Sequence, residues 1–214
     1  MCIRDSPVTT ARTAVSYARM FVSFEGLDGC GKTTQARLLA EALAADGADV
    51  VLTREPGGTP LGEQVRELVL HGDHVAPWAE VALYAASRAQ HVVDVIRPAL
   101  ARGATVVCDR YLDTSVAYQG AGRGLGVDFV LDLNLRVVEG LLPDVTVLVA
   151  IDAETALSRV GEKRDRIERA DAAFWPLVAE AYRDLAERFA ERYVVVDGRL
   201  PVEELAAEIR DCLR

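Results

Sequence analysis

An octapeptide at residues 26–33, GLDGCGKT, constrains the fold of this chain more than any other feature of its sequence. It fits the phosphate-loop pattern G-x-x-x-x-G-K-[ST] at every fixed position, it follows the apolar run 21–25, and a helix-like stretch begins at Lys32. Glycines let backbone N–H groups approach phosphate oxygens closely, and the N-terminus of a helix carries partial positive charge. We therefore predict a strand–loop–helix unit that binds a nucleoside triphosphate.

The predicted contacts to the triphosphate lie in or next to this loop. Lys32 is expected to bridge the β and γ phosphates, and the hydroxyl of Thr33 is expected to hold Mg²⁺. The predicted nucleotide-binding residues of this segment are Gly26, Leu27, Asp28, Gly29, Cys30, Gly31, Lys32, Thr33 and Thr34.

The rest of the chain alternates short apolar runs with longer amphipathic stretches. The short runs predict five strands, at residues 21–25, 50–53, 105–109, 145–151 and 193–196. The longer stretches predict helices at 32–45, 61–70, 79–101, 129–140, 172–192 and 202–213. Such alternation is typical of right-handed βαβ units. We predict a three-layer α/β fold of the P-loop NTPase type, with a five-stranded parallel sheet flanked by helices and a short lid.

The length of the chain limits the number of domains. With 214 residues, of which 50% are hydrophobic, it can bury one core but not two of ordinary size. Residues 1–19 show neither helical nor strand periodicity, and Met20 directly precedes the first apolar run. We expect 1–19 to be a disordered extension or a misassigned start, and 20–214 to form a single domain.

The charge and the apolar pattern exclude some classes of partner. The 24 basic and 33 acidic residues give a net charge of −9, which disfavours a nucleic acid polymer as partner. The sequence has no apolar run long enough for a membrane span and no signal-peptide core, so a cytoplasmic enzyme without a membrane partner is expected. The three histidines, His71, His74 and His91, are too scattered for a metal site, and surface or helix-end positions are expected for them.

The end of the third predicted strand bears on the type of nucleotide-binding protein, because the loop alone leaves motors, switches, transporter subunits and kinases open. A switch GTPase usually has an Asn-Lys-x-Asp element, which this sequence lacks. A hydrolytic ATPase typically ends a strand with two acidic residues. Here Asp109 is followed by Arg110, a pair that suits a second phosphate better than an attacking water.

Four further segments complete a pattern. They are TREPGGTPLGEQVREL at 53–68, YAASRAQH at 84–91, DRYLDTSVAYQGAGRG at 109–124 and GEKRDRIER at 161–169. In a doubly wound sheet the loops after the strands gather at one edge, so the first and third of these segments are expected to face the phosphate loop. Together with that loop, from about residue 20 to 214, the segments closely resemble the thymidylate kinase family. The resemblance implies transfer of the γ-phosphoryl group of ATP to dTMP, with Mg²⁺, giving dTDP and ADP.

The resemblance also assigns residues to the base of dTMP. It places Arg88 on the thymine O4 and Tyr84 against the ring, where the family often has phenylalanine. Ser115 and Gln119 match the remaining base contacts.

Further residues are assigned by resemblance to the sugar and the acceptor phosphate. Glu55 and Pro56 would line the deoxyribose, and Tyr118 matches the tyrosine that crowds the 2′ position of a ribonucleotide. Arg66 and Arg110 would bind the phosphate of dTMP. Asp109 is expected near Mg²⁺, so the predicted metal-binding residues are Thr33 and Asp109, and Asp28 is expected near the 3′-hydroxyl or the metal.

Basic residues crowd the segment 159–169, and a solvated helix face is the ordinary explanation for such a cluster. Phosphoryl transfer, however, builds negative charge that a mobile segment rich in arginine can cover. We predict a lid at about 159–171, with Arg164 and Arg166 on phosphate, Arg159 stacked on adenine, and residues 197–201 at the adenine edge. In the family, the arginine is carried either by the phosphate loop or by the lid, and this loop has none. The predicted catalytic residues are Lys32, Arg110, Arg164, Arg166 and Asp28.

Two other functions stay open at this point: a P-loop kinase for another nucleoside monophosphate or nucleoside, and an ATP-binding module without activity. No nucleophilic side chain is needed for the favoured reaction, because the dTMP phosphate itself attacks. The resemblance further implies a homodimer, for which the Ala-rich helices at 79–101 and 129–142 offer a surface, although such faces also pack inside monomers.

Overall fold

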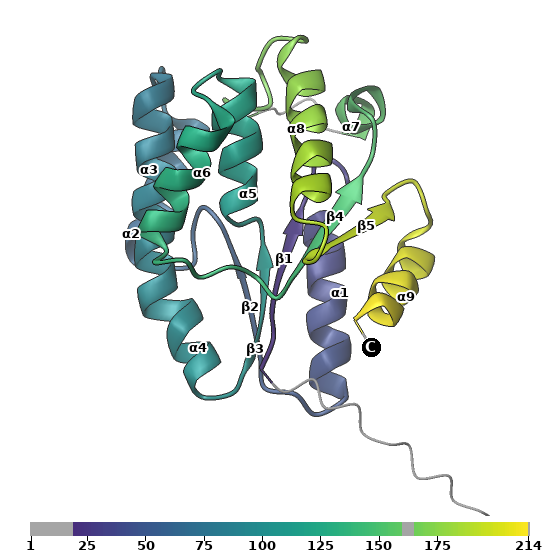
Figure 1. Ribbon diagram of the computed structural model, residues 1–214. Helices are drawn as coiled ribbons and strands as arrows, with labels where there is room; N and C mark the ends of the chain where they lie inside the picture. The colour runs from purple at the N-terminus through teal and green to yellow at the C-terminus, as the bar shows by residue number, and fades with distance from the viewer. Residues whose placement is uncertain (1–18, 160–164, 214) are drawn as a thin grey trace, which may run out of the picture.

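Five parallel strands form the centre of the molecule. In the computed structural model, which describes residues 19–159 and 165–213, they lie in the order β2-β3-β1-β4-β5 (Figure 1). The strands are β1 (Phe21–Glu25), β2 (Val50–Arg54), β3 (Thr105–Asp109), β4 (Val145–Ala150) and β5 (Tyr193–Asp197). The predicted five-stranded parallel sheet is confirmed, and each strand end lies within one residue of its predicted position.

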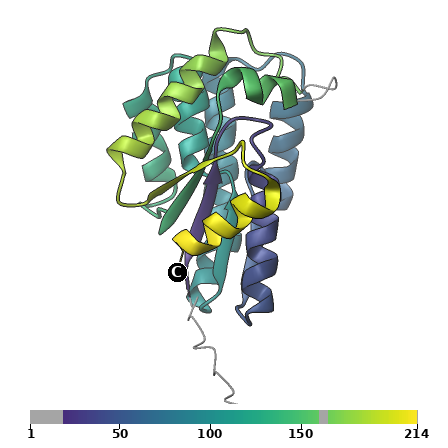
Figure 2. The same cartoon turned by 90° about the vertical axis from the view of Figure 1, so that its right-hand side faces the viewer.

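Helices cover both faces of this sheet (Figures 1 and 2). Along β1, Val22 and Phe24 pack with α1 (Lys32–Ala45) and α9 (Val202–Cys212) on one face. Phe21 packs on the other face, against a second group of helices. The remaining helices are α2 (Pro60–His71), α3 (Pro77–His91), η1 (Val92–Ile96), α4 (Arg97–Ala101), α5 (Leu112–Ser115), η2 (Val116–Gly122), α6 (Val127–Val137), α7 (Ala153–Arg159) and α8 (Phe174–Arg188). The three-layer arrangement agrees with the sequence-based prediction.

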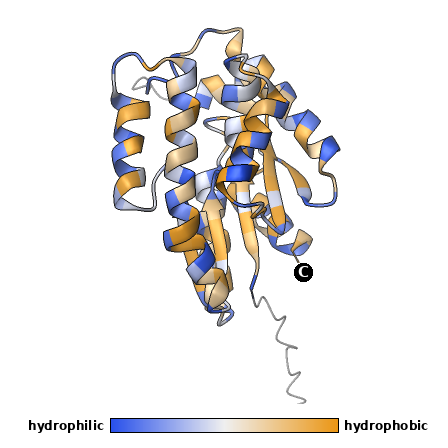
Figure 3. Ribbon diagram, turned by 60° about the vertical axis from the view of Figure 1, so that its left-hand side comes forward, coloured by the Kyte–Doolittle hydropathy of each residue, from blue (hydrophilic) through white to orange (hydrophobic). Residues whose placement is uncertain are grey.

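The hydropathy of the elements explains the layers. Figure 3 shows strands that are mostly hydrophobic along their length and helices on which hydrophobic and hydrophilic residues alternate around the axis. Strands covered on both faces need continuous apolar side chains, and helices on the outside need only one apolar stripe. Within the described residues, no helix has both the length and the apolar character needed to span a bilayer.

Two helical regions differ from the prediction. The single helix expected at 79–101 is three consecutive segments, with the π-helical η1 between α3 and α4. The segment after β3, treated as a connecting segment in the sequence, is helical in α5 and η2 and packs against α6 and α8. Its few charged residues and its small side chains suit burial, and this burial rather than surface amphipathicity stabilises the helix.

The register of the strands assembles one functional edge. Asp109 at the end of β3 pairs with Phe24 of β1 and with Arg54 of β2. The residues that follow these strands therefore begin at the same level. This brings the phosphate loop, Glu55 and Arg110 together at the carboxyl edge of the sheet.

Candidate active site

The phosphate loop connects β1 to α1 in a conformation that only its glycines allow. Gly26 has φ 138°, and a Cβ atom there would lie 2.6 Å from the carbonyl oxygen of Val149. Lys32, at the start of α1, is 6% exposed; its Nζ donates to the carbonyl of Leu27 over 3.1 Å and lies 3.5 Å from Oδ1 of Asp28. The loop thus has the strand–loop–helix context expected for phosphate binding, with its lysine held against it.

Oxygen ligands suitable for a divalent cation meet at the same place. The hydroxyl of Thr33 donates to Oδ2 of Asp109, while Oδ1 of Asp109 is buried and has no partner among the described residues. Within the same residues, no three His, Cys, Asp or Glu side chains come together as a complete metal site. Mg²⁺ is usually bound through one or two protein oxygens together with phosphates and water, so Thr33 and Asp109 fit a cation shared with a nucleotide.

Next to the loop lies a small cavity, called here the inner cavity, with a volume of about 80 Å³. Its lining residues are Asp28, Glu55, Pro56, Arg66, Leu70, Tyr84, Arg110, Thr114, Tyr118, Gln119, Asp165 and Ile167. Seven of the nine residues predicted to bind the acceptor are in this lining, whereas Arg88 and Ser115 are not. Pockets for small molecules are usually several hundred Å³, so a nucleotide needs part of this wall to move aside.

Arg110 links the phosphate loop to the inner cavity. Its guanidinium donates to the Asp28 carboxylate and, over 3.3 Å, to the carbonyl of Gly26. The hydroxyl of Tyr118 donates to the other Asp28 oxygen over 2.9 Å. Burial alone would raise the pKa of Asp28, but the charges of Arg110 and Lys32 hold it well below its usual range. Asp28, Arg110 and Tyr118 therefore form one charged group on the boundary between loop and cavity.

Arg88 lies directly behind the wall of the inner cavity and is 1% exposed. Its Nε donates to Glu55 over 2.6 Å, Nη1 donates to Ser115 over 3.1 Å and to the Asn134 side chain, and Nη2 donates to the carbonyl of Tyr111 over 3.2 Å. Each guanidinium nitrogen thus has a partner within the protein. The structure brings together Arg88, Glu55 and Ser115, three of the residues predicted to bind the acceptor, and adds Asn134 of α6, whose place in an apolar stripe gave no signal.

His91 is a buried member of the same network, which the sequence-based prediction missed. It ends α3, in agreement with the helix-end position expected for it, but it is fully buried and not at the surface. Its Nδ1 lies 2.9 Å from Glu55 Oε1, and its Nε2 lies 2.6 Å from the hydroxyl of Thr53. A Cβ at Gly58 would lie 2.7 Å from His91 Nε2, so the second glycine of EPGGT leaves room for this ring.

Glu80, also missed, is 1% exposed and is bound to Gln119 of the cavity wall, although it does not line the inner cavity itself. It accepts hydrogen bonds from Gln119 over 2.8 Å, from Arg123 over 3.3 and 3.4 Å, and from Arg166 over 2.6 Å. Arg166, predicted to act on phosphate, is thus bound to α3, and its Nε donates to the carbonyl of Val69. Arg164 lies outside the described residues.

A helical spacing connects the residues of α3 that face this region. Positions 80, 84, 88 and 91 are separated by four, four and three residues, so they share one face of the helix. The sequence therefore contained a stripe of polar and aromatic residues that includes Tyr84 and Arg88, the two that the resemblance identified. Applied to the whole helix, this spacing would have predicted Glu80 and His91.

A third buried carboxylate, Glu25, supports the turn that carries Arg110. Glu25 accepts from the backbone N–H of Tyr111 over 2.8 Å, from Thr114 over 2.5 Å and from Tyr182 over 3.0 Å. Arg110 itself has φ 70°, an unusual conformation for a residue with a side chain. Burial, and secondly the nearby Asp113, raises the pKa of Glu25 to about 7.

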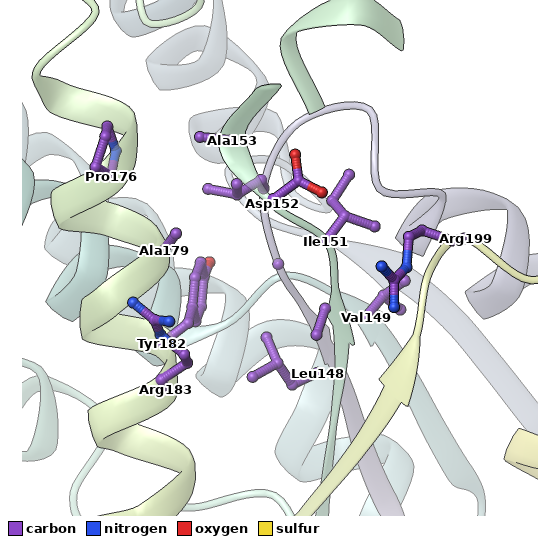
Figure 4. Close-up of a pocket in the computed structure, with 13 residues that line it drawn as sticks. Leu148, Val149, Ile151, Asp152, Ala153, Pro176, Ala179, Tyr182, Arg183 and Arg199 are labelled. Atoms are coloured by element: carbon purple, nitrogen blue, oxygen red, sulfur yellow. The ribbon is translucent and has the colours of Figure 1, made fainter. Parts of the chain in front are cut away.

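The side of the loop opposite the inner cavity has more exposed polar groups. Arg159, at the end of α7, donates to the carbonyl of Gly198 over 2.8 Å, so the two elements predicted to meet at adenine are in contact. A second cavity of about 450 Å³ opens here between β4, α8 and the segment after β5. In Figure 4, Ala179 and Tyr182 of α8 lie on one side of this cavity, Leu148 of β4 and Ile151 lie on the other, and Arg199 comes from the segment after β5.

Comparisons with known proteins agree with this geometry. The model of the thymidylate kinase family matches residues 24–209. The thymidylate kinase of Leifsonia xyli subsp. xyli is 54% identical over an alignment of 196 residues that covers 89% of this chain and 92% of the relative. That of Deinococcus radiodurans is 48% identical over 193 residues, 89% of this chain and 94% of the relative. The crystal structure of thymidylate kinase from Ehrlichia chaffeensis superposes with a TM-score of 0.76 at 33% identity, covering 91% of this chain and 98% of the other.

Proposed function

The chain belongs to the thymidylate kinase family, and we propose that it transfers the γ-phosphoryl group of ATP to the phosphate of dTMP, giving dTDP and ADP. The observation that carries the proposal is the position of the inner cavity. Its wall shares Asp28 with the phosphate loop, and Arg110 touches both. A donor bound in the loop and an acceptor bound in the cavity would therefore meet across this pair.

Phosphoryl transfer requires the chain to position two phosphates and to offset their negative charge. The oxygen of the dTMP phosphate attacks the γ-phosphorus while the bond to ADP breaks, so the protein supplies no nucleophile. Lys32 would bind the transferring group, and Arg66 and Arg110 would hold the acceptor phosphate in line. Arg66 lines the cavity and reaches the carbonyl of Pro56 over 3.1 Å, within range of an acceptor there.

The lid arginines divide between the two sides in this proposal. Arg159 contacts the segment after β5, which supports the predicted place beside adenine. Arg166 is bound to Glu80 and would have to give up this contact to reach a phosphate. We therefore assign Arg166 to the acceptor side, where it holds Glu80. Arg164 stays the sequence-based candidate for the transferring phosphoryl group.

Mg²⁺ would be held by Thr33 and Asp109. The unpartnered Oδ1 of Asp109 supports this assignment, because a buried carboxylate oxygen without a donor suits a cation. When bound, the ion would neutralise charge between the β and γ phosphates.

We also propose a homodimer formed through α3 and α6. One side of α3 and η1 exposes the apolar residues Trp78, Ala82, Ala86 and Val93. Phe129 of α6 lies beside Trp78, with the two ring centroids 5.2 Å apart. Exposed apolar stripes of this kind favour association. Light scattering should give twice the chain mass, and Phe129→Glu should shift it toward the monomer; an unchanged monomer mass for the parent protein would contradict the proposal. The cytoplasmic location stays a prediction from the sequence.

A coupled ADP-release assay tests the reaction. The wild-type protein with Mg²⁺-ATP is given dTMP, dUMP, dCMP, dGMP or thymidine, and one reaction has no acceptor. Release that depends on an acceptor and is fastest with dTMP supports the proposal. Equal release without acceptor would indicate a hydrolase, and no release with retained ATP binding would indicate a module without activity. A different preferred acceptor would keep the fold assignment but reject the assignment of the inner cavity.

A further inference from the structure

The two ends of the Gln119 side-chain amide have different surroundings. Its Nε2 donates to Glu80 over 2.8 Å, whereas its Oε1 is buried and has no partner among the described residues. Gln119 is 1% exposed and lines the inner cavity. Buried polar atoms nearly always have a hydrogen-bond partner, so an unpartnered oxygen on a residue of the cavity wall suits a donor on a ligand.

Glu80 determines which end of the amide is available. The two ends of a glutamine amide have almost the same shape, so packing alone hardly distinguishes the two orientations. A carboxylate, however, only accepts hydrogen bonds. The amino end of Gln119 must therefore face Glu80, and the oxygen must face away from it.

Glu80 is itself fixed by two arginines from different parts of the chain. Arg123 follows η2, and its guanidinium also lies 4.8 Å from the centre of the Phe174 ring. Arg166 precedes α8 and is also bound to the carbonyl of Val69 at 2.8 Å. With three donors converging on it, the Glu80 carboxylate has little freedom to turn.

We propose that Glu80 is a positioning residue for base selection, which fixes the Gln119 amide so that its oxygen accepts a hydrogen bond from N3–H of thymine. Thymine and uracil carry N–H at position 3, whereas cytosine carries an acceptor nitrogen there. A fixed acceptor therefore binds the first two bases and repels the third, independently of the contact to the atom at position 4. The inference rests on the proposed function, because it needs dTMP in the inner cavity.

The test compares two ratios of kcat/KM in the wild type and in Glu80→Gln. The substituted amide can accept as well as donate, so Gln119 is free to turn. We expect the preference for dTMP over dCMP to fall about 10–100-fold, the range of one buried hydrogen bond to a base. The preference for dTMP over dUMP should stay constant, because these bases differ only at C5. The matched control is Glu139→Gln, an exposed glutamate paired with Arg97, and it should change neither ratio.

A merely structural role of Glu80 would give another pattern. General loosening of the cavity would lower both ratios together, and either this result or two unchanged ratios would overturn the proposal. If Glu80→Gln does not fold, as judged by thermal unfolding, Gln119→Leu decides. This variant must lose the discrimination against dCMP to a similar degree and keep that against dUMP; full retention of the former would overturn the proposal. A wild-type protein that does not phosphorylate dTMP would instead reject the proposed function.

Discussion

Around Arg88 and Glu80, charged side chains are largely buried and paired with one another, whereas beside the second cavity they bind backbone oxygens or pair at the surface. The Arg88–Glu55 pair has side chains 1% and 2% exposed, while those of the Arg199–Asp197 pair are 67% and 40% exposed. A base must be distinguished from similar bases, which requires polar groups fixed before binding. A triphosphate can be bound by backbone N–H groups and a lysine, which need fewer fixed side chains.

The difference has an energetic consequence. Removing one partner of a buried ion pair leaves an uncompensated charge in the interior, whereas exposed pairs contribute little. Substitutions on the acceptor side should therefore affect folding and selectivity together. Substitutions on the nucleotide side should either lower the rate of catalysis without lowering stability or have no measurable effect. Four predictions, from the largest expected effect to the smallest, test this distinction.

Arg88→Ala should lower the free energy of unfolding by about 3–5 kcal/mol, because Glu55 would be left buried without its strongest partner. Urea denaturation measures this change. Arg88→Lys should retain more stability, yet it should lose most of the activity toward dTMP because an ammonium cannot reproduce the contacts of the guanidinium. A loss below about 1 kcal/mol in Arg88→Ala would show that the acceptor side is not held by this pair.

Lys32→Ala should lower kcat by about 10²–10³-fold, the usual effect of removing one charged group that stabilises the transition state. The affinity for dTMP, measured by calorimetry without ATP, should change little. A lower kcat with unchanged dTMP affinity would show that the phosphate loop and the inner cavity bind their ligands independently. A comparable loss of dTMP affinity would show that they act as one unit.

Glu25→Gln should change how stability depends on pH. Because burial raises the pKa of Glu25 from its usual value of 4.5 to about 7, the folded protein binds this proton more tightly than the unfolded chain. The associated stability is fully present below about pH 4.5 and is lost as the pH rises through about 7, by roughly 3 kcal/mol in total. The difference in unfolding free energy between wild type and variant should vary with pH in that window. A difference that is constant from pH 4.5 to 8 would contradict the expectation.

Arg199→Ala should give the smallest effect. Its partner Asp197, whose pKa the hydrogen bonds from Arg199 lower to about 2, lies at the surface after β5. The thermal midpoint should stay within the error of the measurement, and so should kcat with dTMP. A clear loss of stability would remove the contrast with Arg88.

The same contrast explains how much the sequence could predict. The phosphate loop is eight consecutive residues with fixed glycines, and the strands are continuous apolar runs, so both could be predicted with accurate ends. The network around Glu80 joins positions 80, 119, 123 and 166, which no local pattern connects. Asn134 and Glu25 likewise look like isolated polar residues in apolar segments. Their partners come from distant elements, so only the folded chain reveals why they are buried.

Hydrogen exchange with and without each substrate tests most directly whether the acceptor side is fixed before binding. We predict that amides of α3 (Pro77–His91) and η2 (Val116–Gly122) exchange slowly in the free protein and change little when dTMP is added. Residues 26–33 and 197–201 should exchange faster and become protected on addition of Mg²⁺-ATP. Fast exchange in α3 and η2 that slows strongly with dTMP alone would show that the buried network forms only on binding, and would contradict this account.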